Sequence, residues 1–246
     1  MGWETHAGAS ITGDVRVFRG AVGRDLYVYV PPSPGPHAVL YMHDAQNLFD
    51  EALSNSGEWR VDETMEALAL EGVAAIVVGI PHGGDLRGHE LAGDGADDYL
   101  ALVVERVVPL VENDFDVDAS RRGIAGSSLG AVASLHGLYR HPDLFAFAGV
   151  FSPAFWWNGD DRWFDLVRKT PPPRARIYMD VGDDEGEGDE GRRRAYVDGF
   201  ERMSALLREK GFGEDDLRVV LDPGGIHHES AWARRFPDAM RFLLAP

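Results

Sequence analysis

A serine between glycines is the clearest candidate for chemistry in this chain. Gly126, Ser128 and Gly130 fit the pattern G-x-S-x-G, between a strand-like run (residues 122–125) and a helix-like run (residues 129–140). Glycines at these places let a chain turn sharply from strand to helix, which exposes the central hydroxyl at the helix N-terminus. The pentapeptide alone is weak evidence in a chain with 29 glycines. Its context predicts that Ser128 is a nucleophile, and a glycine-rich turn without catalysis is the alternative.

Two histidines near the C-terminus are candidates for the general base that a serine nucleophile needs. His227 and His228 lie in the loop between a strand-like run (residues 217–221) and a helical pattern (residues 229–244). When the nucleophile precedes the acid and the base in the chain, the base comes from this last loop. The chain has nine histidines, so position rather than residue type selects these two.

Three acidic residues follow the preceding strand-like run (residues 176–181) and could orient the histidine. They are Asp183, Asp184 and Glu185, and the residues alone do not choose among them. Asp180 falls inside the strand and is less suited to face a site. Most of these charges are expected to lie in a solvated loop, and their spacing does not match a calcium-binding loop. We therefore expect one orienting carboxylate here and no metal.

A serine that attacks a carbonyl group also needs two backbone N–H donors for the oxyanion. Leu129, directly after the candidate nucleophile, provides one. The other is expected from Ala45 or Gln46, in the loop after the strand-like run at residues 38–42. The segment PHGG at residues 81–84 looks more like an oxyanion motif, but it follows the next strand. In this fold the strand before the oxyanion loop is followed by a helix, a strand and a helix, and then by the nucleophile strand. This order selects the loop after residues 38–42.

Short β-rich runs alternate with helical patterns along most of the chain, which is typical of an α/β protein. Several runs are continuously apolar, as central parallel strands are. The proline-rich segments are too short to be interdomain linkers, so we expect one α/β domain over residues 1–246 with about eight strands. The predicted strands are residues 14–18, 26–30, 38–42, 74–80, 122–125, 146–151, 176–181 and 217–221, and the predicted helices are residues 58–71, 96–113, 129–140, 192–210 and 229–244.

Composition excludes several classes of function. The 246 residues include 24 Lys and Arg against 41 Asp and Glu, so the formal charge is 24 − 41 = −17. Such a protein repels nucleic acid and anionic membranes. Without cysteine there is no thiolate nucleophile, disulfide or cysteine-ligated zinc. No apolar run approaches the ~20 residues of a membrane span, and the N-terminus does not read as a signal peptide, so we expect a cytoplasmic protein.

Several segments together resemble the esterase family of α/β hydrolases, which includes esterase D, enterobactin-type siderophore esterases and feruloyl esterases. The similarity is strongest to short bacterial members with little or no cap, and it covers most of the chain. It implies an α/β-hydrolase fold with a mostly parallel central sheet flanked by helices. The segments are residues 40–50, 77–91, 121–157, 177–186 and 224–244.

The resemblance assigns catalytic roles to particular positions. It implies that Ser128 is the nucleophile. It favours His227 as the base, because residues 227–232 form the family's H-x-E-x-x-W arrangement. Residues 182–185 form G-x-x-acid, which implies that Glu185 is the acid. Some siderophore esterases of the family are described as serine–histidine dyads, so a weakly orienting acid is the alternative.

Four further residues are expected at the substrate pocket. Arg87 and Glu90 match an R-x-x-E feature of the family and are expected to shape the pocket, with a local salt bridge as the alternative. Trp156 and Trp157 follow a predicted strand and are expected to line an acyl or aryl pocket, with rim packing as the alternative. The short connection that follows leaves no room for a large lid, which favours small soluble esters over aggregated lipid.

The predicted activity is hydrolysis of a small soluble carboxylic ester through an acyl-enzyme, with no metal or organic cofactor. Thioester hydrolysis and siderophore-lactone cleavage on the same site are alternatives. Transfer to a sugar hydroxyl and a non-catalytic α/β-hydrolase scaffold are weaker ones. The acyl chain, the alcohol and the oligomeric state do not follow from the sequence.

Overall fold

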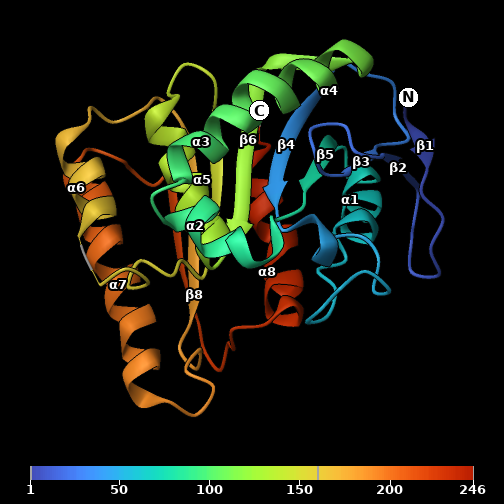
Figure 1. Ribbon diagram of the computed structural model, residues 1–246. Helices are drawn as coiled ribbons and strands as arrows, with labels where there is room; N and C mark the ends of the chain where they lie inside the picture. The colour runs from blue at the N-terminus through green and yellow to red at the C-terminus, as the bar shows by residue number, and fades with distance from the viewer. Residues whose placement is uncertain (1, 160, 246) are drawn as a thin grey trace.

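The computed structural model describes residues 2–159 and 161–245, so the two end residues of the domain predicted over residues 1–246 lie outside the described residues. Nine strands of the described chain form one sheet. The strand order is β1-β2-β3-β5-β4-β6-β7-β8-β9 (Figure 1). From β5 to β9 all neighbours are parallel, whereas β1, β2, β3 and β5 pair antiparallel. The strands are β1 Glu4–Thr5, β2 Asp14–Phe18, β3 Leu26–Val30, β4 His37–His43, β5 Ala75–Ile80, β6 Val117–Ser127, β7 Phe147–Phe151, β8 Arg176–Gly182 and β9 Leu217–Asp222.

Helices cover both faces of this sheet. Helices α1 and α8 pack on one face, and α2 to α7 pack on the other. Each face has its own apolar core, so the fold has three layers. The helices are α1 Val61–Ala69, α2 Arg87–Ala92, α3 Ala96–Leu102, α4 Val108–Asp114, α5 Leu129–Arg140, α6 Arg162–Lys169, α7 Glu190–Glu209 and α8 Glu229–Leu243.

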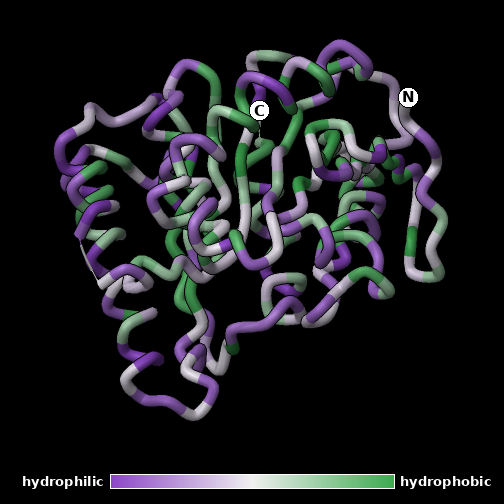
Figure 2. The backbone as a smooth tube through the Cα atoms, in the orientation of Figure 1, coloured by the Kyte–Doolittle hydropathy of each residue, from purple (hydrophilic) through white to green (hydrophobic). Residues whose placement is uncertain are grey.

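The central strand β4 illustrates why these runs form a doubly covered sheet. All seven of its residues are buried. Val39 and Tyr41 point into one core, and Leu40 and Met42 point into the other. A strand covered on both faces needs no polar alternation, which explains the continuous apolar run. Figure 2 shows the same pattern along the backbone, with hydrophobic stretches concentrated in the inner strands and helix faces.

The predicted fold class is confirmed, and the differences lie in short or interrupted elements. The two-residue strand β1 and the short helices α2 and α6 are present in the structure but were not predicted from the sequence. The helix predicted over residues 96–113 is three consecutive segments, because a π-helical turn at Val103–Val107 separates α3 from α4. Pro109 lies in the first turn of α4, and a proline cannot donate a backbone hydrogen bond there.

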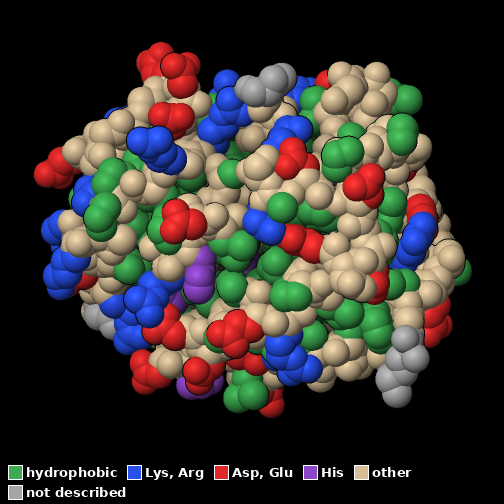
Figure 3. Space-filling view, turned by 90° about the horizontal axis from the view of Figure 1, so that it is seen from above, with side chains coloured by type: hydrophobic (Ala, Val, Ile, Leu, Met, Phe, Trp, Pro, Cys, Tyr) green, Lys and Arg blue, Asp and Glu red, His purple; other side chains and the backbone are tan. Residues whose placement is uncertain are grey.

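The surface mixes charges of both signs. Acidic side chains lie among basic ones on the face in Figure 3, in keeping with the arginine–carboxylate pairs along the helices. No helix in the described part of the chain is long and apolar enough to span a membrane.

Candidate active site

Ser128 occupies a strained turn between β6 and α5. Its backbone has φ 57° and ψ −118°, a conformation that costs a non-glycine residue about 1–3 kcal/mol. The Ser128 N–H donates to the Phe151 carbonyl at 2.9 Å, which holds the turn against β7. The flanking glycines are a steric requirement, because a Cβ on Gly126 would lie 2.9 Å from the carbonyl carbon of Gly130. The turn therefore has the geometry predicted from the G-x-S-x-G pattern.

His227 and Glu185 face each other across two touching loops. His227 Nδ1 lies 2.9 Å from Glu185 Oε2, and the Glu185 side chain is fully buried. The loops meet so closely that a Cβ on Gly182 would lie 2.1 Å from the Gly225 oxygen. The backbone N–H of Gly182 donates to Glu185 Oε1 at 2.6 Å, which fixes the carboxylate. The structure thus brings together the histidine and the acid that the family resemblance selects.

The competing candidates have other partners. His228 is the N-cap of α8, where its side chain accepts from the Ser230 N–H. Asp183 Oδ1 accepts from the Gly224 N–H at 2.7 Å, and Asp184 is exposed. Neither acid contacts His227 among the described residues. Geometry therefore separates the three acids, which the residue types alone could not do.

A buried network of charged and polar side chains holds the Glu185 carboxylate in place. Arg235 Nε lies 3.0 Å from Asp180 Oδ2, and Arg235 Nη2 lies 3.7 Å from Glu185 Oε1. Arg235 also donates to the Ser152 hydroxyl, which in turn donates to Glu185. Burial lowers the pKa of Arg235, but its carboxylate neighbours outweigh this and raise it, so Arg235 stays charged. Arg235 was not predicted from the sequence, although an arginine on the apolar face of an amphipathic C-terminal helix was a usable signal.

Replacing Arg235 with methionine is expected to destabilise the protein by about 3 to 5 kcal/mol, because it leaves buried carboxylates without their counter-ion. Urea unfolding measures this change. The matched control is Arg234→Met, since the side chain of Arg234 is 60% exposed and also pairs with Asp222. That exposed pair should contribute less than about 1 kcal/mol. Equal losses in the two variants would contradict the structural role assigned to the buried network.

The oxyanion candidates lie at the start of a short 3₁₀ helix, Ala45–Asn47, and at the start of helix α5, and both starts border the same cleft. Gln46 and Leu129 both line this cleft together with Ser128. N–H groups in the first turn of a helix have no intrahelical acceptor and point outward. The side chain of Ala45 is 2% exposed and faces β5, where a Cβ on Gly79 would lie 2.8 Å from its own Cβ, so only Gln46 of the two candidates is a cleft-lining residue.

Arg87 and Glu90 do not pair with each other. Arg87 lines the cleft and donates to both carboxylate oxygens of Asp44 at 2.8 Å, which anchors the left-handed residue before Ala45. Glu90 lies outside the cleft lining, contrary to its predicted place at the pocket. Its carboxylate is occupied by Arg24 at 2.8 Å and by the Gly83 N–H at 3.0 Å. Glu90 thus holds the loop after β5 rather than a substrate.

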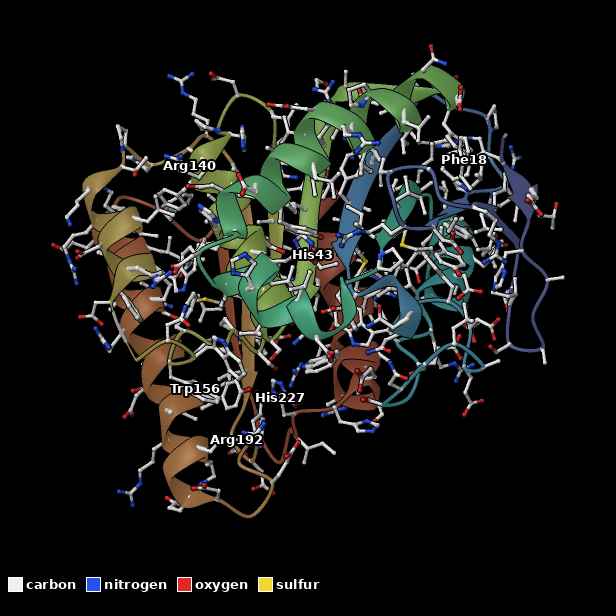
Figure 4. The ribbon with its side chains drawn as sticks, viewed as in Figure 1. Phe18, His43, Arg140, Trp156, Arg192 and His227 are labelled. Carbon is white, nitrogen blue, oxygen red and sulfur yellow. The ribbon has the colours of Figure 1, made fainter. Side chains whose placement is uncertain are left out.

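Aromatic side chains form one wall of the cleft, which has a volume of about 590 Å³. Trp156 and Trp157, which were expected at the substrate pocket, both line this cleft, with ring centroids 6.1 Å apart. Tyr196 and Arg192 of α7 line it as well and were not identified from the sequence. Figure 4 shows Trp156, Arg192 and His227 gathered near one end of β8.

A larger hollow of about 750 Å³ lies near the opposite ends of β7 and β8, beside Arg121, Pro172 and Phe212. None of the candidate catalytic residues lines it, so the chemistry belongs to the smaller cleft.

The arrangement of fold and site defines the class of this protein. A serine at a strained strand-to-helix turn, followed in the chain by an acid and then by a histidine after the last strand, is the α/β-hydrolase arrangement. The chain belongs to the putative esterase family, whose model, described as "Putative esterase", matches residues 21–243. The family resemblance read from the sequence is thereby confirmed, and the chain is a carboxylic ester hydrolase.

Known proteins similar to this chain include two from Bacillus subtilis. The uncharacterized protein YbbA is 24% identical over 91% of this chain and 93% of its own length. The ferri-bacillibactin esterase BesA is 25% identical over 88% of this chain and 82% of its own length. Among solved structures, siderophore hydrolase EstA from Aspergillus nidulans has a TM-score of 0.71 at 19% identity, covering 98% of this chain and 94% of EstA. The last comparison concerns the fold alone.

Proposed function

We propose that this chain hydrolyses esters of small soluble substrates through an acyl-enzyme on Ser128. Ser128 attacks the ester carbonyl while His227 Nε2 takes its proton, and the N–H groups of Leu129 and Gln46 hold the oxyanion. His227 then gives the proton to the leaving alcohol, and water releases the acid by the same steps in reverse order. The observation that carries the proposal is the 2.9 Å contact of His227 with buried Glu185 in the cleft lined by Ser128.

The aromatic wall favours an acyl group that is flat and apolar. Trp156, Trp157 and Tyr196 offer ring faces and edges, which bind such groups well. A lactone or ester of a siderophore with aromatic groups is therefore the second candidate substrate, and the similarity to BesA supports it. The cytoplasmic location and the single domain over residues 1–246 remain predictions.

Labelling with a serine-directed fluorophosphonate, together with a substrate panel, tests this proposal. The panel contains p-nitrophenyl acetate, butyrate, hexanoate and octanoate, a benzoate ester, a thioester and a catecholate trilactone. We expect one label per chain on the peptide that contains Ser128, and kcat/KM highest for short or aromatic acyl groups. A folded protein that is neither labelled nor active on any substrate would refute the proposed function and favour a non-catalytic scaffold.

A further inference from the structure

Tyr196 contacts the catalytic histidine at the nitrogen that the reaction uses. Its hydroxyl lies 3.2 Å from His227 Nε2, whereas Nδ1 is already bound to Glu185. The tyrosine ring is tilted by 35° against the imidazole, with centroids 4.6 Å apart. Trp156 packs edge-on against the tyrosine ring, with ring centroids 5.4 Å apart. The phenol is therefore held in one place beside the reacting nitrogen.

The surroundings of this hydroxyl keep it protonated. Tyr196 is 1% exposed, and this burial raises the pKa of its phenol. Ser128 and Arg192, the latter one helical turn earlier, lower the pKa of Tyr196, but burial dominates and the pKa is raised. At neutral pH the phenol is thus a neutral hydrogen-bond donor beside the base, in the cleft that Ser128 also lines.

An ester's leaving oxygen must occupy the same small region. To receive the proton from His227 Nε2, that oxygen has to lie about 2.6–3.2 Å from the nitrogen. The Tyr196 hydroxyl lies 3.2 Å from the same atom, so an oxygen bound there becomes its neighbour. Negative charge grows on this oxygen as the carbon–oxygen bond breaks, and a fixed donor stabilises such charge.

We propose that Tyr196 is a further catalytic residue, which donates a hydrogen bond to the leaving-group oxygen as the acyl-enzyme forms. The inference rests on the proposed function. The proton that the alcohol finally carries comes from His227, and the bond that breaks joins the acyl carbon to the leaving oxygen. Tyr196 keeps its own proton throughout. The substrates for which it matters are esters of alkyl alcohols, whose leaving oxygen is strongly basic, rather than activated aryl esters.

Tyr196→Phe tests this role by removing only the hydroxyl. For ethyl butyrate we expect kcat/KM to fall about 10- to 100-fold, the usual effect of one hydrogen bond to a charged group. For p-nitrophenyl butyrate we expect less than about a 3-fold change, because the leaving oxygen carries little charge and needs little help. Both esters form the same acyl-enzyme, and kcat/KM reports only its formation, so their ratio isolates the leaving group.

Tyr139→Phe is the matched control. Tyr139 lies on α5, is 2% exposed, and its hydroxyl has no hydrogen-bond partner among the described residues. Removing that hydroxyl should leave both rates unchanged. Equal losses on the two esters, no loss, or a gain of activity in Tyr196→Phe would each overturn the proposal while leaving the proposed function intact. If neither the wild type nor Tyr139→Phe hydrolyses either ester, the proposed function is refuted, and the role of Tyr196, which depends on it, is refuted as well.

A second variant covers the case in which Tyr196→Phe does not fold. Difluorotyrosine at position 196 keeps the ring and lowers the phenol pKa. Hydrolysis of ethyl butyrate should then decline at the pH where the fluorinated phenol ionises, while p-nitrophenyl butyrate is unaffected. A pH profile identical to that of the wild type would overturn the proposal.

Discussion

Replacing Ser128 with alanine is expected to lower kcat/KM for p-nitrophenyl butyrate by about 10⁴- to 10⁶-fold, the range typical for loss of a serine nucleophile. Without the hydroxyl no acyl-enzyme forms, and only substrate binding and the oxyanion donors still act on the reaction. The measurement is steady-state hydrolysis with the same protein preparation checked for phosphonate labelling. Both activity and labelling should disappear.

Ser134→Ala is the control for this variant. Ser134 lies on the same helix, is fully buried, and its hydroxyl donates to the Gly130 carbonyl at 2.7 Å, so the substitution removes a buried serine without touching the cleft. Its activity should stay within about 3-fold of the wild type. Residual activity in Ser128→Ala above about one per cent would contradict the assignment of the nucleophile.

The strain at Ser128 allows a further check on the same site. Glycine tolerates φ 57° and ψ −118° much better than serine. We therefore expect Ser128→Gly to raise the free energy of unfolding by about 1 kcal/mol while abolishing activity. Urea unfolding measures the gain. A loss of stability in this variant would mean that the turn is not strained in solution.

The nucleophile could be predicted from the sequence because its signal is local. Ser128 depends on glycines two residues away and on the elements directly before and after it. The base could be narrowed to His227 or His228, because chain order identifies the loop after the last strand as the place for the base. Local pattern and order are both written in the linear sequence, so both predictions could be made without coordinates.

The supporting residues could not be predicted because tertiary packing brings them together. Arg235, Asp180 and Ser152 come from α8, β8 and the end of β7, and none stands in a recognisable spacing with Glu185. Tyr196 lies in the first half of the long polar helix α7, and no sequence motif or spacing links it with His227, which it contacts in the structure. For Glu90 the sequence left two interpretations open, a place at the pocket and a local salt bridge, and the structure shows a salt bridge with Arg24.

The predicted secondary structure agrees best with the observed structure in the most deeply buried elements. The central strands were recognisable by continuous apolar runs, and their boundaries agree with the structure within a few residues, except that β6 begins at Val117. Helix α6 was missed because its eight residues, RWFDLVRK, follow a loop and give only two turns of periodicity. Short elements carry too few residues for a pattern to stand out.

Replacing Glu185 with glutamine is expected to lower kcat by about 10³- to 10⁴-fold. Glu185 is a buried carboxylate that accepts from His227 Nδ1, from the Gly182 N–H and from the Ser152 hydroxyl. An amide of the same shape cannot stabilise the imidazolium that forms when His227 takes a proton, and its NH₂ group can favour the wrong tautomer. Folding should survive, because Arg235 keeps Asp180 and Asp222 as partners.

Asp184→Asn is the matched control for the acid, since Asp184 is an exposed neighbour in the same loop. Its rate should equal that of the wild type within about 3-fold. The comparison decides between two forms of the site, because full activity in Glu185→Gln would mean that Ser128 and His227 act as a dyad. The buried contact at 2.9 Å argues for the triad, since a carboxylate kept out of water next to an imidazole lowers the cost of charging that imidazole. A dyad would leave this buried charge without a catalytic purpose and would make its contribution purely structural, visible as a loss of stability with no loss of rate.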